Sequence, residues 1–235
     1  MAVTVVTQPH TVASRAGVSV VATVDESDSE ALEGLLDAIE GTLGDHGLSL
    51  ADVVRTRLHA ATRAGRDAAS AVRFRRLAGP ARCATSSYID PSMFASGDGV
   101  RLAAIALSGA AADKVAVEYE PRQPPCRFVA TGDLVFLSGV TSTEPGFDAQ
   151  LARIAPRVAD NLRAAGDTLG RDVTPTGVTA WVHRSVSDGE LADLDMRLGL
   201  EGTPCAVMRC DGYSAPGKLI EVEVDAAAVA GRARA

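Results

Sequence analysis

The sequence predicts an α+β protein that is built from two diverged copies of one unit. Short apolar runs of strand length alternate with segments in which apolar residues recur at helical spacing, and this order of elements occurs twice. A segment rich in proline separates the two occurrences. With 235 residues, the chain is long enough for two small domains that each bury a core.

The second half of the chain shows the order of elements most clearly. Apolar residues recur along one face from Phe147 to Leu162, which is helical spacing, and Gly166 suits the position just after such a helix. The predicted order is β-α-β-α-β-β. Its elements are strand 134–139, helix 147–165, strand 178–183, helix 188–198, and strands 205–210 and 218–225.

The first half follows the same order. Its predicted elements are strand 18–22, helix 29–43, strand 53–60, helix 68–77, and strands 84–88 and 100–107. Pro80 then corresponds to Pro204, and His59 to His183. The predicted organisation is one degenerate unit over 1–110, a stiff connector over 111–125, and a second unit over 126–235.

Charge and hydropathy limit the partners that we expect. The net charge of −7 argues against a nucleic-acid partner, because phosphate binding needs clustered Lys and Arg. The amino terminus lacks the features of a signal peptide, and no apolar run approaches the roughly 20 residues that span a bilayer. We therefore expect a cytoplasmic protein with no membrane partner.

The cysteines predict neither a metal site nor a disulfide framework. The four cysteines show no CxxC spacing, and free thiols are the usual state in the cytosol. A zinc site from Cys205, Cys210 and one histidine is a weak alternative. The chain also lacks a GxGxxG turn after a strand, a phosphate-binding Walker loop, a GxSxG elbow and an HExxH helix. Dehydrogenase, kinase, serine-hydrolase and zinc-protease functions thus lose their usual support, and we expect no cofactor.

Motifs in both units match those of one known family. In the second unit these are Gly132-Asp133-Leu134-Val135-Phe136-Leu137-Ser138-Gly139 and Leu219-Ile220-Glu221-Val222-Glu223. In the first unit they are Asp52-Val53-Val54-Arg55-Thr56 and Gly79-Pro80-Ala81-Arg82-Cys83. These motifs resemble the Rid (YjgF-type) family, and the resemblance implies two fused chorismate-mutase-like units with a barrel-like sheet core and helices outside. It also implies ligand clefts between neighbouring units and a homo-oligomer, with a trimer favoured, although fusion of the units also permits a pseudo-oligomeric monomer.

The chain resembles chorismatases more distantly. Fused Rid-type units occur in that class of enzyme, and the strand Trp181-Val182-His183-Arg184 and the ending Glu221-Val222-Glu223 carry the likeness. The chain is short for a chorismatase, which counts against this version.

The Rid resemblance implies a carboxylate anchor at Arg82 and an acid–base glutamate at Glu223. A guanidinium can hold a carboxylate in a bidentate pair. Glu221 shares one face of the strand with Glu223, because side chains alternate along a strand. The first unit has no matching carboxylate, and the second has Ala206 where the first has Arg82. We therefore predict one composite cleft, in which Ser138 helps to stabilise developing charge.

Five further residues are candidates for this cleft. His183 could move a proton near neutral pH or could only cap a strand end. Arg209 could replace the missing arginine of the second unit. A nucleophilic Cys83 is the minority interpretation, because no general base is evident beside it. Tyr213 and Trp181 could contact substrate or simply complete the core.

Three functions remain open at this point. The first is an enzyme that hydrolyses an imine or enamine of a small compound with a carboxylate or carbonyl group. The second is chorismatase-like release of pyruvate, or a cyclase step that forms or aromatises a ring in secondary metabolism. The third is a ligand-binding relic without catalysis, since a fold does not guarantee activity.

Overall fold

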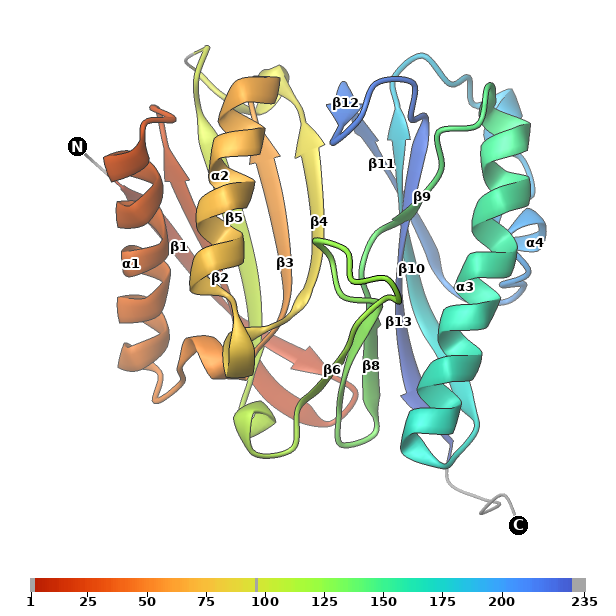
Figure 1. Ribbon diagram of the computed structural model, residues 1–235, viewed down its shortest axis with the longest axis horizontal. Helices are drawn as coiled ribbons and strands as arrows, with labels where there is room; N and C mark the ends of the chain where they lie inside the picture. Colours follow the sequence, from red (N-terminus) through yellow and green to blue (C-terminus); the bar gives the residue numbers. More distant parts are fainter. Residues whose placement is uncertain (1–2, 96, 230–235) are drawn as a thin grey trace.

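The protein folds as two α+β units placed side by side, with their sheets facing each other and the longer helices outside (Figure 1). This description comes from a computed structural model and covers residues 3–95 and 97–229. The elements form two sheets, and neither sheet of the described chain closes on itself into a barrel. The predicted fold class is confirmed, with two open sheets in place of a closed barrel.

The first unit has a sheet of the order β1-β2-β5-β3-β4, and the short β12 of the second unit extends it. Helices α1 and α2 pack on it, and both begin at a side-chain N-cap, Asp28 and Thr62 respectively. The elements are β1 (Thr4–Val12), β2 (Arg15–Val24), α1 (Ser29–Asp45), β3 (Val53–Ala60), α2 (Arg63–Arg76), β4 (Ala84–Ile89) and β5 (Val100–Leu107).

The second unit has a sheet of the order β11-β10-β13-β8-β7-β6, and α3 packs on it. Its elements are β6 (Val115–Val117), β7 (Phe128–Thr131), β8 (Leu134–Leu137), β9 (Val140–Thr141), α3 (Phe147–Leu169), β10 (Val173–His183), α4 (Leu194–Arg197), β11 (Cys205–Cys210), β12 (Gly212–Tyr213) and β13 (Ile220–Ala228).

The strand order confirms the internal repeat. The series β2-β5-β3-β4 of the first unit corresponds to β8-β13-β10-β11 of the second. In both series the last pair of strands is parallel and the other neighbours are antiparallel. The two copies therefore share one topology, and each has its own core of small aliphatic side chains.

The second helix of the second unit is much shorter than the sequence predicts. In place of a helix over 188–198, the chain forms a 3-10 turn, Gly189–Leu191, and the four-residue α4. Asp193 between them has a φ of 54°, a left-handed conformation that interrupts a helix. Leu194 and Leu198 are nevertheless buried. Their helical spacing therefore predicted which residues face the core, but the helix is shorter than predicted.

Other differences concern the ends of elements. Helix α3 continues past Gly166 to Leu169 and ends at the left-handed Gly170. The strands β1, β6, β7, β9 and β12 were not predicted. Strand β6 lies within the expected connector, 111–125, and pairs with β7. No helix in residues 3–95 and 97–229 is long and apolar enough to cross a membrane.

Candidate active site

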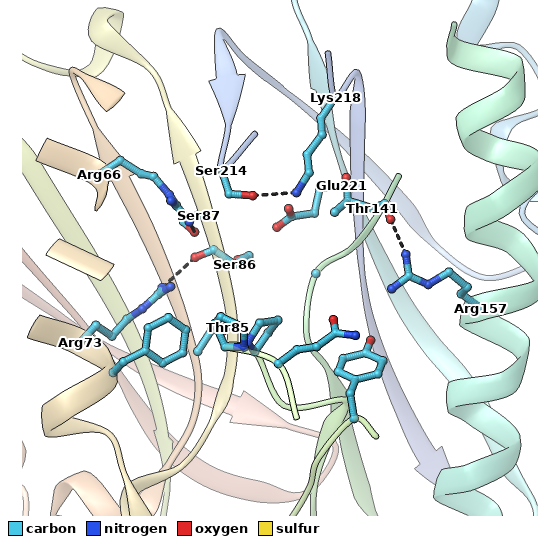
Figure 2. A pocket seen from close by; sticks show the side chains of 16 residues that line it. Arg66, Arg73, Thr85, Ser86, Ser87, Thr141, Arg157, Ser214, Lys218 and Glu221 are labelled. Carbon is cyan, nitrogen blue, oxygen red and sulfur yellow. Dashed lines mark hydrogen bonds between the residues drawn. The ribbon is translucent and has the colours of Figure 1, made fainter. Parts of the chain in front are cut away.

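A cleft of about 270 Å³ lies at the seam between the two units (Figure 2). The first unit contributes α2 and β4 to its lining, and the second contributes β9, α3, β13 and the loop before β13. The segment between β6 and β7 supplies one wall through Tyr119, Gln123 and Pro124. Both units and the segment that joins them therefore form the walls of the cleft.

Two backbone contacts hold β4 against the second unit at the cleft. The Thr85 N–H donates to Ser138 Oγ at 3.1 Å, and the Gly139 N–H donates to the Thr85 carbonyl at 3.1 Å. Both Thr85 and Gly139 line the cleft. Farther along β4, Tyr213 pairs with Tyr88 in the short β12 ladder. At the seam, a strand of the second unit thus extends the sheet of the first unit.

Glu223 lies in a buried ion cluster that joins the units. Arg57 Nε donates to its Oε2 at 2.7 Å and Arg55 Nη1 at 3.1 Å, while Ser86 and Tyr88 hydroxyls donate to Oε1. Burial alone would raise the pKa of Glu223, but the charges of Arg55 and Arg57 outweigh it and lower that pKa to about 2. Glu223 is therefore a permanent carboxylate.

Glu221 lies two residues earlier on the same face of β13 and lines the cleft. Its residue surface is 5% exposed, and within the described chain Oε1 has no hydrogen-bond partner. Burial raises the pKa of Glu221 to about 7, although the charge of Lys218 lowers it, and the charge of Glu223 raises it further. Near neutral pH, Glu221 can therefore both give and take a proton.

Gly139 makes room for the carboxyl group of Glu221. A Cβ at this position would lie 2.1 Å from Glu221 Oε1 and 2.5 Å from its carboxyl carbon. Any other residue at 139 would therefore have to displace the group that we consider most reactive. This close approach explains why glycine follows Ser138 here.

Arg73 is a buried cation on the first-unit side of the cleft. Its Nη1 donates to the Ser86 carbonyl at 2.8 Å, whereas Nε has no partner among the described residues. Arg73 is 2% exposed, and burial lowers its pKa to about 10, so it stays charged at neutral pH. A buried guanidinium without a carboxylate partner favours the binding of an anion.

Three more cations line the cleft. Arg66 lies on α2 beside Arg73, donates to Ser87 Oγ at 3.1 Å and pairs with the exposed Asp67. Arg157 on α3 donates to the Thr141 carbonyl at 2.6 Å, and Lys218 donates to Ser214 Oγ at 2.6 Å. Figure 2 shows Arg66 and Arg73 to the left of Glu221, Lys218 above it and Arg157 to the right.

Arg82, the predicted anchor, lies outside this cleft. Its Nε and Nη2 each donate to Glu118 at 2.9 Å, and Nη2 also donates to the Pro124 carbonyl at 2.8 Å. Arg82 thus forms a bidentate pair with a carboxylate, as predicted from its guanidinium group. The carboxylate is that of Glu118, in the segment that forms a wall of the cleft. Because Pro124 lines the cleft, Arg82 helps to fix the position of that wall.

Ser138 and Cys83 are buried beneath the cleft surface and do not line the cleft. Ser138 is buried, accepts from the backbone of Thr85 and lies 3.6 Å from Cys126 Sγ. Cys83 is 1% exposed, and burial raises the pKa of its thiol. A thiol that is buried and protonated is a poor nucleophile.

The remaining predicted residues, Tyr213, Trp181, His183 and Arg209, do not line the cleft. Tyr213 donates to the carbonyls of Trp181 at 2.9 Å and Leu219 at 3.1 Å, and Trp181 stacks on Tyr88 with ring centroids 4.3 Å apart. His183 is within hydrogen-bond distance of Ser185 Oγ and the Asp211 carbonyl. Arg209 donates to the Val186 carbonyl and pairs with Asp188.

Of the predicted site residues, all of which the structure describes, Glu221 is the one that lines the cleft. The four lining cations were missed. One signal for Arg73 was available, because helical spacing places it on the same face as Gly65 and Ala69, which are both buried. An arginine on the apolar face of a helix is unusual and marks a candidate site.

Residues 3–95 and 97–229 contain no group of three or more His, Cys, Asp or Glu side chains arranged to hold a metal ion. The lining of the cleft supplies four cations and one carboxyl group. This set of side chains matches an anionic organic molecule.

The fold and the site together define a class: a fused two-unit α+β protein with a cationic cleft, and a buried carboxyl group in it, at the seam of the units. Among solved structures, a chorismatase has a similar fold, with a TM-score of 0.60 and 16% identity. The match covers 94% of this chain and 79% of the chorismatase. The predicted likeness to chorismatases is confirmed at the level of the fold.

Smaller proteins match half of the chain. Rv2704 of Mycobacterium tuberculosis, from the YjgF/YER057c/UK114 family, covers 50% of this chain with 100% of its own, at 24% identity and a TM-score of 0.41. The Rid-family protein YyfA of Yersinia pestis covers 49% with 99% of its own, at 18% identity and a TM-score of 0.40. No protein-family model matches the sequence, and a search of curated proteins finds no match.

Proposed function

We propose that the seam cleft is the active site of an enzyme that hydrolyses an imine or enamine of a small carboxylate-bearing compound, with Glu221 as general acid. One observation carries the proposal. Two glutamates on one face of one strand have pKa values of about 7 and about 2, so their environments assign them different roles. Glu221 exchanges protons, and Glu223 fixes the seam.

The chemistry follows from a proton donor beside an anion-binding cation. The Glu221 carboxylic acid donates its proton to the terminal carbon of the enamine, and the nitrogen lone pair forms the C=N⁺ bond of an iminium ion. Water adds to the iminium carbon, and the proton lost by that water returns to Glu221. The resulting carbinolamine loses ammonia, and a ketone remains.

We place the carboxylate anchor at Arg73. Arg82 is already bound to Glu118, whereas Arg73 is buried, charged and without a carboxylate partner among residues 3–95 and 97–229. A bound substrate carboxylate would supply the missing counter-charge. It would also orient the reacting carbons toward Glu221, and orientation of this kind lowers the barrier of the reaction.

The proposal is tested with 2-aminoacrylate that is generated in the assay. We expect Glu221→Gln to lower kcat by about 10²- to 10⁴-fold, because the amide keeps the shape but cannot donate the proton. Arg73→Gln should mainly raise KM. Glu201→Gln, an exposed residue in a turn outside the cleft, serves as the matched control. Wild-type kcat in Glu221→Gln would refute the proposed role.

A second candidate is hydrolysis of an enol ether with release of pyruvate. The observation in its favour is the fold shared with a chorismatase over 94% of this chain. The proton donor would be the same, because protonation of the terminal carbon of an enol ether gives an oxocarbenium ion that water can attack. Assaying chorismate and 2-aminoacrylate side by side separates the two candidates. Binding of either compound without turnover would favour the ligand-binding relic.

A further inference from the structure

A second, outer chamber of about 420 Å³ adjoins the seam cleft. The two chambers share four lining residues, which are Gln123, Thr141, Arg157 and Lys218. Ser142, Thr143, Glu144 and Arg153 line the outer chamber alone. Because these four residues line both chambers, a single ligand could extend from the cleft into the outer chamber.

The outer chamber has an excess of positive charge. Arg153 and Arg157 lie one turn apart on α3, and like charges at this spacing repel each other. Glu144 is the carboxylate in the lining. Its Oε1 lies 4.0 Å from Arg153 Nε, and both side chains are largely exposed, so this ion pair is weak. In the described part of the chain, no carboxylate forms an ion pair with Arg157 or Lys218.

Burial makes this excess charge costly. Desolvation lowers the pKa of Lys218, although the charge of Glu221 partly offsets that effect. Arg157 is only partly exposed, and its Nη1 is bound to the Thr141 carbonyl. An anion in the outer chamber would offset the repulsion among three cations, and the hydroxyl groups of Ser142 and Thr143 could donate to it.

We propose that the outer chamber is a second anion subsite, so that the natural ligand is an elongated small molecule with an acidic group at each end. This inference rests on the proposed function for the first acidic group, which binds at Arg73. The second group, a carboxylate or a phosphate, lies against Arg153, Arg157 and Lys218. Glu221 lies between Arg73 and Arg157 (Figure 2), so a ligand that spans the two groups has its reacting carbon beside Glu221.

The subsite is tested by calorimetric binding of simple acids to the full chain. The probes are butyrate and hexanoate, which have one acidic group, and succinate, glutarate and adipate, which have two. We expect at least one of the three dicarboxylates to bind about tenfold or more tightly than the monocarboxylates, because charge-assisted hydrogen bonds have this magnitude. 3-Phosphonopropionate has the same two methylene groups between its acidic groups as succinate. If it binds more tightly than succinate, the natural ligand carries a phosphate at this end, and if it does not, the group is a carboxylate.

Variants locate the second group. Arg153→Gln should remove most of the preference for two acidic groups and change the affinity for butyrate by less than about twofold. Arg163→Gln is the matched control, because Arg163 is also an exposed arginine on α3 and lies outside both chambers. It should leave both affinities unchanged.

Two results would overturn the subsite. Either no dicarboxylate binds more tightly than the monocarboxylates, or Arg153→Gln weakens both classes equally. These outcomes do not depend on turnover. A chain that prefers dicarboxylates but keeps wild-type kcat in Glu221→Gln would retain the subsite and lose the proposed catalytic role.

Discussion

At the scale of single residues, Glu221 and Glu223 show how environment divides one residue type into two roles. Both are buried, and both point from β13 toward the first unit. Two arginines and two hydroxyl groups surround Glu223, whereas the charge that most favours ionisation of Glu221 is that of the partly desolvated Lys218. The difference in pKa follows from these neighbours.

The activity should therefore depend on the protonation of Glu221. Because its pKa is raised to about 7 and the protonated form is the donor, kcat should fall as the pH rises above 7. Lys218→Met removes the charge that lowers this pKa, so the falling limb should move to higher pH. A pH–rate profile of both chains is the measurement. A limb that stays in place would show that another group is the donor.

At the scale of elements, α2 has Arg73 at a position where the spacing of its buried residues predicts an apolar side chain. The buried face of α2 contains Gly65, Ala69, Ser70 and Val72 beside Arg73. Among residues 3–95 and 97–229, the buried guanidinium of Arg73 has one carbonyl as its hydrogen-bond partner and no counter-charge in an ion pair, which opposes folding. Arg73 on α2 thus destabilises the fold but supplies positive charge to the lining of the cleft.

Arg73→Met should consequently stabilise the free chain while it weakens ligand binding. The flexible apolar side chain fills a similar volume without a desolvated charge, so Tm should rise by a few degrees, which corresponds to roughly 1 kcal/mol. Calorimetry should show weaker binding of butyrate in the same variant. A lower Tm together with wild-type affinity would contradict the role of Arg73.

At the scale of the whole molecule, the ion cluster around Glu223 joins the two units. Arg55, which is 1% exposed, contacts Glu223, Asp225 and the carbonyls of Leu137 and Val224. All of these partners belong to the second unit. Removing one member of a buried pair leaves the other charge without its counter-charge, so the seam depends on Arg55.

Arg55→Met should lower the free energy of unfolding by about 3–5 kcal/mol. Arg76→Gln is the control, because Arg76 forms a network of exposed pairs with Glu33, Asp37 and Glu40, and it should cost less than about 1 kcal/mol. Denaturant unfolding measures both. If the free energy of unfolding fell equally in Arg55→Met and Arg76→Gln, the buried cluster would contribute no more to stability than a surface network does.

A buried histidine adds a pH dependence to the same seam. His59 of the first unit packs 4.9 Å from Trp181 of the second, and burial lowers its pKa from 6.5 to about 4, to which the charge of Arg101 also contributes. Between these values the unfolded chain binds a proton that the folded chain does not. His59 therefore lowers stability as the pH falls from 6.5 toward 4.

Replacement by an apolar ring isolates this effect. His59→Phe should become more stable relative to the wild type as the pH is lowered across that window, by up to about 3 kcal/mol. The quantity to compare is the difference in unfolding free energy between His59→Phe and the wild type at each pH. The raised pKa of Glu221 makes both chains more stable as the pH falls, and this effect cancels in the difference. A gap between the two chains that does not change with pH would show that His59 titrates normally.

The homo-oligomer that the Rid resemblance implies stays a prediction. Light scattering of the purified chain measures it directly, and a trimer is the expected result.

Local patterns predicted most of the fold. The strands over 53–60, 100–107 and 205–210 have the predicted bounds, because turn residues flank compact runs with strand-like composition. Strand β1 was missed because nearly all of its residues are exposed, so no alternation of buried and exposed positions marks it. Strand β12 was missed because two residues carry no pattern, and its pairing with β4 joins segments more than 100 positions apart.

The sequence by itself determined the duplicated α+β unit, the faces of its helices and strands, and the presence of two glutamates on one face of the last strand. The tertiary structure decided which glutamate can exchange a proton and which arginine is left without a carboxylate. The physical reason is distance along the chain. Arg55 and Arg57, which hold Glu223 ionised, lie 168 and 166 positions before it, and only folding brings them to β13.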